Sequence, residues 1–229
     1  NAFFRYKPHQ WRNRAVCDNY EPGSTFKIFL MAAALNEAVV STKQKIDCEN
    51  GAFRVGGKII HDHKKYQKLT PAEIIKYSSN IGSAKIGKML ERETFHRYLA
   101  AFGFGEPTGI DLPGEANGLL RSPGKWFEVD LAAISFGQGV SVTSIQLTTA
   151  AAAIANGGYL MEPYVVERVV DSQGQVTRSS QPRVVRKVIA QDVAQRVARM
   201  MEMTTEDGGT STNARVPGFR GGSGNRRNR

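Results

Sequence analysis

Residues 20–35 read Tyr-Glu-Pro-Gly-Ser-Thr-Phe-Lys-Ile-Phe-Leu-Met-Ala-Ala-Ala-Leu. The Glu-Pro-Gly triplet is a turn signal, and strong helix formers that are apolar on nearly every face follow it. A helix that is apolar all round is normally buried inside a protein. We therefore predict a buried helix over about residues 24–38, preceded by a turn.

Ser24 and Lys27 lie three residues apart at the start of this helix, so their side chains share one face. The first turn of a helix offers free N–H groups and a positive dipole end, which favour a developing alkoxide or oxyanion. A lysine removed from water there is expected to be a neutral amine that accepts the hydroxyl proton. The pair has the chemistry of an activated serine nucleophile, although Ser-x-x-Lys is common by chance and a serine at a helix start also serves as a cap.

Ser78, Ser79 and Asn80 interrupt a second helical region. A capping box, Thr-Pro-Ala-Glu, opens a helix over about residues 70–77, and the helical pattern resumes over residues 81–91. At such a break, a hydroxyl can relay a proton, and an amide can hold a lysine or a substrate carbonyl. The alternative is a pair of helix caps, because serine and asparagine are both common at helix boundaries.

The order of the remaining elements indicates an α+β fold. Helices come first and strands come near the end, without the alternation of a doubly wound sheet. The further predictions are a hairpin over residues 53–60, a helix from about 94 to 103 or 105, an irregular stretch over 106–126, a helix over 143–156, a hairpin over 164–178 and a helix over 191–204.

The composition is that of a globular protein, with 41% hydrophobic and 23% charged residues in a chain of 229. No apolar run approaches the roughly 20 residues of a membrane span. The formal charge of +10 is concentrated near both ends, which we interpret as solvated surface. The chain begins at Asn1, so we expect a fragment whose anchor lies upstream. Cys17 and Cys48 could form a disulfide or stay free, and their spacing indicates neither a zinc site nor a redox motif.

Several longer stretches resemble the transpeptidase domain of class B penicillin-binding proteins, and the division-specific branch is the most similar. They are residues 20–27, residues 76–82 (Lys-Tyr-Ser-Ser-Asn-Ile-Gly), residues 136–143 (Phe-Gly-Gln-Gly-Val-Ser-Val-Thr) and residues 153–158 (Ala-Ile-Ala-Asn-Gly-Gly). The similarity extends from about residue 12 to residue 219. It implies a penicillin-binding protein transpeptidase and serine β-lactamase-like fold, in which a helical lobe lies beside a five-stranded antiparallel sheet. Residues 1–220 would be a partial domain without its C-terminal strands, and residues 221–229 an aberrant Gly/Arg-rich tail.

The resemblance also implies a D-alanyl-D-alanine transpeptidase that cross-links peptidoglycan stem peptides and is acylated by β-lactams. Ser24 would be the nucleophile, Lys27 the acylation base, Ser78 the relay to the leaving amine, and Asn80 the group that holds Lys27 and a substrate amide. No cofactor, metal or nucleic acid is implied. The expected partners are a glycosyltransferase and other division proteins, at the periplasmic face of the bacterial cytoplasmic membrane.

The third motif of the resemblance, Lys-Thr-Gly, is expected within a few residues of Arg220, on the strand that closes the active-site cleft. Residues 221–229 read instead Gly-Gly-Ser-Gly-Asn-Arg-Arg-Asn-Arg, and no lysine follows Lys187. The missing strand would supply a carboxylate-binding group and one donor of the oxyanion hole, and losing such a donor costs about 10²–10³ in rate. Two explanations stay open: a fragment that ends in a scrambled frame or an artificial tail, or a catalytically silent member.

Two other classes of function stay open. One is a non-catalytic penicillin-binding or divisome-interaction module. The other is a serine β-lactamase, which needs a water-activating base that the sequence does not identify. The triplet His61-Asp62-His63 could suggest a metal site, but no third ligand stands at a suitable spacing, so we interpret it as a solvated turn.

Overall fold

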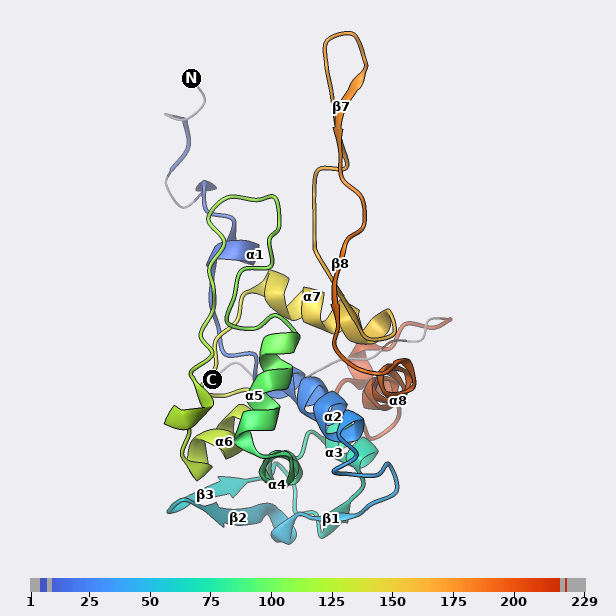
Figure 1. The fold of residues 1–229 in the computed structure, drawn as a ribbon. Coiled ribbons are helices and arrows are strands. Elements are labelled where there is room, and N and C mark those ends of the chain that lie inside the picture. The colour runs from blue at the N-terminus through green and yellow to red at the C-terminus, as the bar shows by residue number, and fades with distance from the viewer. Residues whose placement is uncertain (1–4, 8–9, 219–220, 222–229) are drawn as a thin grey trace.

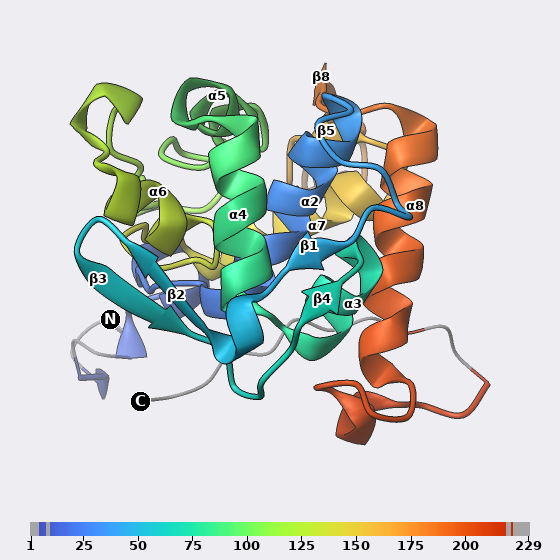
Figure 2. The same ribbon diagram turned by 90° about the horizontal axis from the view of Figure 1, so that it is seen from below.

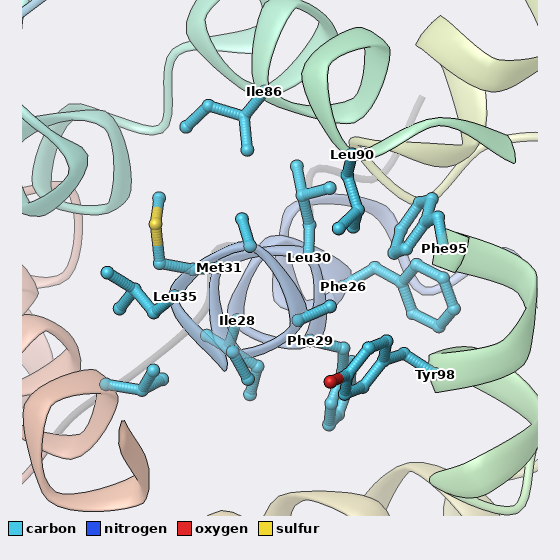
Figure 3. Close-up of a cluster of buried hydrophobic side chains, with 14 of the residues drawn as sticks. Phe26, Ile28, Phe29, Leu30, Met31, Leu35, Ile86, Leu90, Phe95 and Tyr98 are labelled. Atoms are coloured by element: carbon cyan, nitrogen blue, oxygen red, sulfur yellow. The ribbon is translucent and has the colours of Figure 1, made fainter. Parts of the chain in front are cut away.

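The buried helix predicted from the sequence lies at the centre of the fold. The computed structural model describes residues 5–7, 10–218 and 221, so the predicted tail, apart from Gly221, lies outside the described residues. The segment begins as a 3-10 turn, Gly23–Phe26, and continues as helix α2, Lys27–Asn36. Figure 3 shows α2 end-on, with apolar side chains from neighbouring elements on several sides. Phe29, Leu30 and Ala33 are fully buried, as the absence of a polar face predicts.

Other helices surround α2, which packs against α3, α4, α5 and α8 (Figures 1 and 2). Most of them lie where the sequence predicts. Two helices, α1 and α6, were not predicted, because α1 is a single turn in a polar segment and the short apolar pattern of α6 follows a long irregular stretch. The helices are α1 (Arg14–Cys17), α3 (Pro71–Tyr77), α4 (Asn80–Leu90), α5 (Arg92–Ala101), α6 (Glu128–Ile134), α7 (Ser144–Ala155) and α8 (Gln191–Glu202).

The strands of the described residues form four separate two-stranded antiparallel sheets. The pairs are β1 (Ile46–Asp47) with β4 (Lys68–Leu69), β2 (Ala52–Val55) with β3 (Lys58–His61), β5 (Tyr159–Met161) with β8 (Val184–Lys187), and β6 (Arg168–Val170) with β7 (Val176–Ser179). The two predicted hairpins are thus confirmed, whereas the predicted five-stranded sheet is not formed by these residues. The fold is α+β, and the β6–β7 hairpin projects far from the helical body (Figure 1).

The two cysteines are free thiols in the structure. Cys17 Sγ lies 3.0 Å from the carbonyl oxygen of Gly114, and Cys48 is fully buried. Burial raises the pKa of the Cys48 thiol, which a hydrogen bond with Ser79 partly offsets. Of the two states left open by the sequence, the structure holds the reduced one.

Helix α3 begins with the predicted capping box. Glu73 accepts hydrogen bonds from the backbone N–H and the hydroxyl of Thr70, both at 2.8 Å, and these bonds lower the pKa of Glu73. A carboxylate whose pKa is lowered by folding stabilises the protein above its unfolded pKa, and this contribution disappears as the pH falls through the folded pKa.

We therefore expect Glu73→Ala to lower the free energy of unfolding by about 1 kcal/mol at neutral pH. The difference from the unsubstituted chain should shrink in acid. Urea denaturation at a series of pH values measures it. A difference that stays constant down to the acid limit would show that the charge of Glu73 contributes nothing.

Candidate active site

The structure places Ser24 and Lys27 one turn apart, with Ser24 in the 3-10 turn and not in the α-helix itself. The backbone N–H of Lys27 donates to the carbonyl oxygen of Ser24, which closes this turn. Lys27 is only 2% exposed, whereas Ser24 is half-buried. A buried lysine needs polar partners because an isolated ammonium group is costly to remove from water.

Those partners come from the break between α3 and α4. Nζ of Lys27 donates to the carbonyl oxygen of Ser78 at 2.6 Å, to Ser78 Oγ at 3.0 Å and to Asn80 Oδ1 at 2.8 Å. Ser78 Oγ in turn lies 2.8 Å from Ser24 Oγ. The four residues singled out in the sequence therefore form one continuous hydrogen-bonded network, in which the Ser78 hydroxyl bridges Ser24 and Lys27.

Ser78 has a backbone conformation that few residues other than glycine adopt. Its φ of 58° and ψ of 43° are left-handed, and it forms the C-cap of α3. Ser79 immediately becomes the N-cap of α4. Strained backbone of this kind is concentrated at functional sites. Here it presents both the carbonyl oxygen and the hydroxyl of Ser78 to the side-chain nitrogen of Lys27.

The amide group of Asn80 has its orientation fixed by two partners of opposite kind. Its Oδ1 accepts from Lys27, while its Nδ2 donates to the carbonyl oxygen of His61 at 3.2 Å. The carbonyl oxygen of His61 can only accept, and the side-chain nitrogen of Lys27 donates here, so a flipped amide would lose both bonds. The last residue of strand β3 thus helps to aim Asn80 at Lys27.

The Phe-Gly-Gln-Gly stretch supports the loop that carries Ser24. The N–H of Gly23 donates to the carbonyl oxygen of Gly137 at 3.0 Å, and the N–H of Gly139 donates to a carboxylate oxygen of Glu21 at 2.8 Å. A Cβ atom at Gly137 would lie 2.1 Å from the carbonyl oxygen of Gly23. This contact is between backbones, so no side-chain rotation can relieve it.

We expect Gly137→Ala to slow acylation of Ser24 by about 10²-fold, because displacing the loop misplaces the nucleophile. The matched control is Gly174→Ala. Gly174 has the same φ of +80°, but a Cβ atom there would meet nothing within 4 Å, so the substitution carries the backbone strain alone. Rates of β-lactam acylation of the two variants measure the difference. Equal rates would mean that the contact between Gly137 and Gly23 does not position Ser24.

One residue that supports this site, Asp62, has no signal in the sequence. Interpreting residues 61–63 as a solvated turn was wrong for Asp62, whose carboxylate accepts hydrogen bonds from Ser79 and Asn80. Asp62 stands 17 and 18 residues before these partners, and no motif spacing connects them. Only the folded chain brings them together.

Comparison with known proteins identifies the class to which this fold and site belong. Residues 1–222 match the family described as the penicillin binding protein transpeptidase domain. The chain belongs to this family, and the resemblance seen in the sequence is confirmed.

Among its relatives is stage V sporulation protein D of Bacillus subtilis, with 37% identity over 214 residues. That alignment covers 92% of this chain and 33% of the relative. The peptidoglycan D,D-transpeptidase FtsI of Escherichia coli is 29% identical over 91% of this chain and 33% of its own length. The chain thus spans about a third of the length of these curated relatives.

Solved structures have the same fold. The TP domain of penicillin-binding protein 3 from Burkholderia pseudomallei superposes with a TM-score of 0.83 and 33% identity, covering 92% of this chain and 61% of that one. Penicillin-binding protein 3 of Mycobacterium tuberculosis, complexed with aztreonam, gives a TM-score of 0.82 and 30% identity. The alignment covers 90% of this chain and 47% of that one. The predicted fold class is therefore confirmed.

Proposed function

We propose that this chain carries the nucleophile and base of a serine D-alanyl-D-alanine transpeptidase, with Ser24 as the nucleophile. The observation that carries the proposal is the hydrogen-bond path from Ser24 through Ser78 to the buried amine of Lys27. In the structure Lys27 donates to Ser78 and Ser78 donates to Ser24. When Lys27 is a neutral amine, these donor roles can reverse, and the path then carries the Ser24 proton to a base as the oxygen attacks. Membership of the transpeptidase family supports the same assignment.

The reaction on this proposal has two acyl-transfer steps. Ser24 Oγ bonds to the carbonyl carbon of the penultimate D-alanine, and its proton passes to Lys27. The peptide C–N bond breaks, the amine of the terminal D-alanine takes a proton through Ser78, and an ester remains on Ser24. The amine of a second stem peptide then attacks the ester, a new amide forms, and Ser24 recovers its proton.

Asn80 has a supporting role in this proposal. Its Oδ1 keeps Lys27 in place. The family resemblance implies that Asn80 also holds an amide of the substrate. The Lys-Thr-Gly motif that would complete the site does not occur in residues 1–229. The proposal therefore rests on the first two motifs.

β-Lactams are the proposed inhibitors because their ring amide resembles the scissile bond. Attack by Ser24 breaks the ring C–N bond, and the amine stays tethered to the acyl group. The relative from Mycobacterium tuberculosis, solved in complex with aztreonam, supports this choice of ligand class.

The proposed location is the periplasmic face of the cytoplasmic membrane, and the proposed partners are a glycosyltransferase and other division proteins. The name of FtsI, a peptidoglycan D,D-transpeptidase, supports a peptidoglycan substrate. Within the described residues, no helix is both long and apolar enough to cross a membrane.

A stem peptide ending in D-alanyl-D-alanine, supplied together with an acceptor peptide, tests the proposal. We expect release of D-alanine and formation of a cross-linked dimer. Stable acylation by a penicillin without any cross-linking would instead indicate a silent penicillin-binding module. Rapid hydrolysis of the penicillin adduct would indicate a β-lactamase.

A further inference from the structure

Asp62 lies directly after strand β3 and reaches the start of helix α4. Its Oδ1 accepts from the backbone N–H groups of Asn80 at 2.6 Å and Ile81 at 3.0 Å, and its Oδ2 accepts from Ser79 Oγ at 2.6 Å. Bonds to a carboxylate are about twice as strong as bonds between neutral groups. One half-buried side chain thus holds three consecutive residues.

These bonds go beyond ordinary helix capping. Ser79 already caps α4 by accepting from the N–H of Gly82 at 2.9 Å. Asp62 accepts from the N–H groups of Asn80 and Ile81, which precede Gly82 in the chain. A carboxylate is also favoured at the positive end of a helix dipole. The residues held by Asp62 directly follow Ser78, and one of them is Asn80. The shorter path from Asp62 to Lys27 therefore runs through Asn80, and a second path runs through Ser79 to Ser78.

The β2–β3 hairpin, which directly precedes Asp62, packs against the helical body. The hairpin lies beside α4 and α6 (Figure 2). Its Val55 forms a buried cluster with Ala84 of α4 and Ala132 of α6. Next to Asp62, the carbonyl oxygen of His61 accepts from the side chain of Asn80. Adjacent residues of one segment thus bind both the backbone and the side chain of Asn80.

We propose that Asp62 is a positioning residue of the acyl-transfer site. Its carboxylate fixes the Ser79–Ile81 backbone so that Ser78 and Asn80 present their oxygens to Lys27. Without it, the start of α4 is free to shift, and the hydrogen-bond path from Ser24 to Lys27 lengthens. This inference rests on the proposed function, because it assumes that Lys27 acts on Ser24.

The test measures the rate of acylation by a fluorescent penicillin, at a temperature where circular dichroism shows each variant to be folded. We expect Asp62→Ala to slow acylation by about 10²-fold, because small displacements of catalytic groups have effects of this size. Asp62→Asn keeps a carbonyl oxygen for the helix N–H groups and should recover much of the rate.

Two comparisons separate positioning from stability alone. Glu73→Ala removes a capping carboxylate from the start of the neighbouring helix α3, where Glu73 bonds Thr70. The acylation rate of this variant should match that of the unsubstituted chain. In an Asn80→Ala background, Asp62→Ala should cause a smaller loss than in the unsubstituted chain, because both changes break the path through Asn80.

The result that overturns the inference is acylation of Asp62→Ala at the unsubstituted rate, or a full additional loss in the Asn80→Ala background. Should Asp62→Ala fail to fold, Asp62→Glu decides, because it keeps the carboxylate but displaces it by one methylene group. Positioning then predicts slower acylation, and acylation at the unsubstituted rate contradicts it. Failure of the unsubstituted chain to react with the penicillin would instead overturn the proposed function.

Discussion

Replacing Ser24 with alanine is expected to abolish covalent labelling by a fluorescent penicillin. The substitution removes the only atom proposed to bond to the acyl group, so the loss is complete and not partial. Ser24 is half-buried in a 3-10 turn, and its hydroxyl contacts Ser78, so an alanine fits without a steric conflict. Gel fluorescence after denaturation measures the covalent adduct.

The matched control is Ser172→Ala, which removes a hydroxyl from the exposed turn between β6 and β7. Labelling of this variant should equal that of the unsubstituted chain. Persistent labelling of Ser24→Ala would mean that another nucleophile reacts, and the assignment of Ser24 would be wrong.

Replacing Lys27 with methionine is expected to slow acylation by about 10²–10⁴-fold, the usual contribution of a positioned base. Methionine keeps much of the buried aliphatic stem of this 2% exposed side chain. It offers no amine to accept the Ser24 proton through Ser78. The oxygens of Ser78 and Asn80 lose their shared donor, so we also expect some loss of stability.

The rate of labelling per folded molecule measures this effect, and near-ultraviolet circular dichroism verifies the fold. Lys88→Met is the control for removal of a positive charge, because the Lys88 side chain is 65% exposed and pairs with Glu128. An unchanged rate in Lys27→Met would refute the role of Lys27 as the base.

Local patterns predicted much of the fold. The buried helix, the capping boxes of α3 and α7 and both hairpins depend on residues close together in the chain, where side-chain period and turn chemistry act directly. The pairing of β5 with β8 was not predicted, because these short strands lie on either side of the β6–β7 hairpin. Such pairings depend on contacts that no local window contains.

Some residues of the candidate site could likewise be predicted from local sequence patterns, and others could not. Ser24 with Lys27, and Ser78 with Asn80, stand at short spacings, so each pair could be found from the sequence. That the two pairs meet is a property of the fold, because Lys27 and Asn80 are 53 residues apart. Asp62 contacts the backbone of Asn80 and Ile81 and the hydroxyl of Ser79, and Gly137 contacts the backbone of Gly23. These partners lie in other segments, and the residues next to Asp62 and Gly137 in the sequence do not indicate the contacts.

Mass spectrometry of the unsubstituted chain after incubation with benzylpenicillin shows whether Ser24 is the nucleophile. We expect the intact mass to rise by one penicillin molecule and peptide mapping to place the adduct on Ser24. A protein that gains no mass, or an adduct found on a different residue, would contradict this assignment.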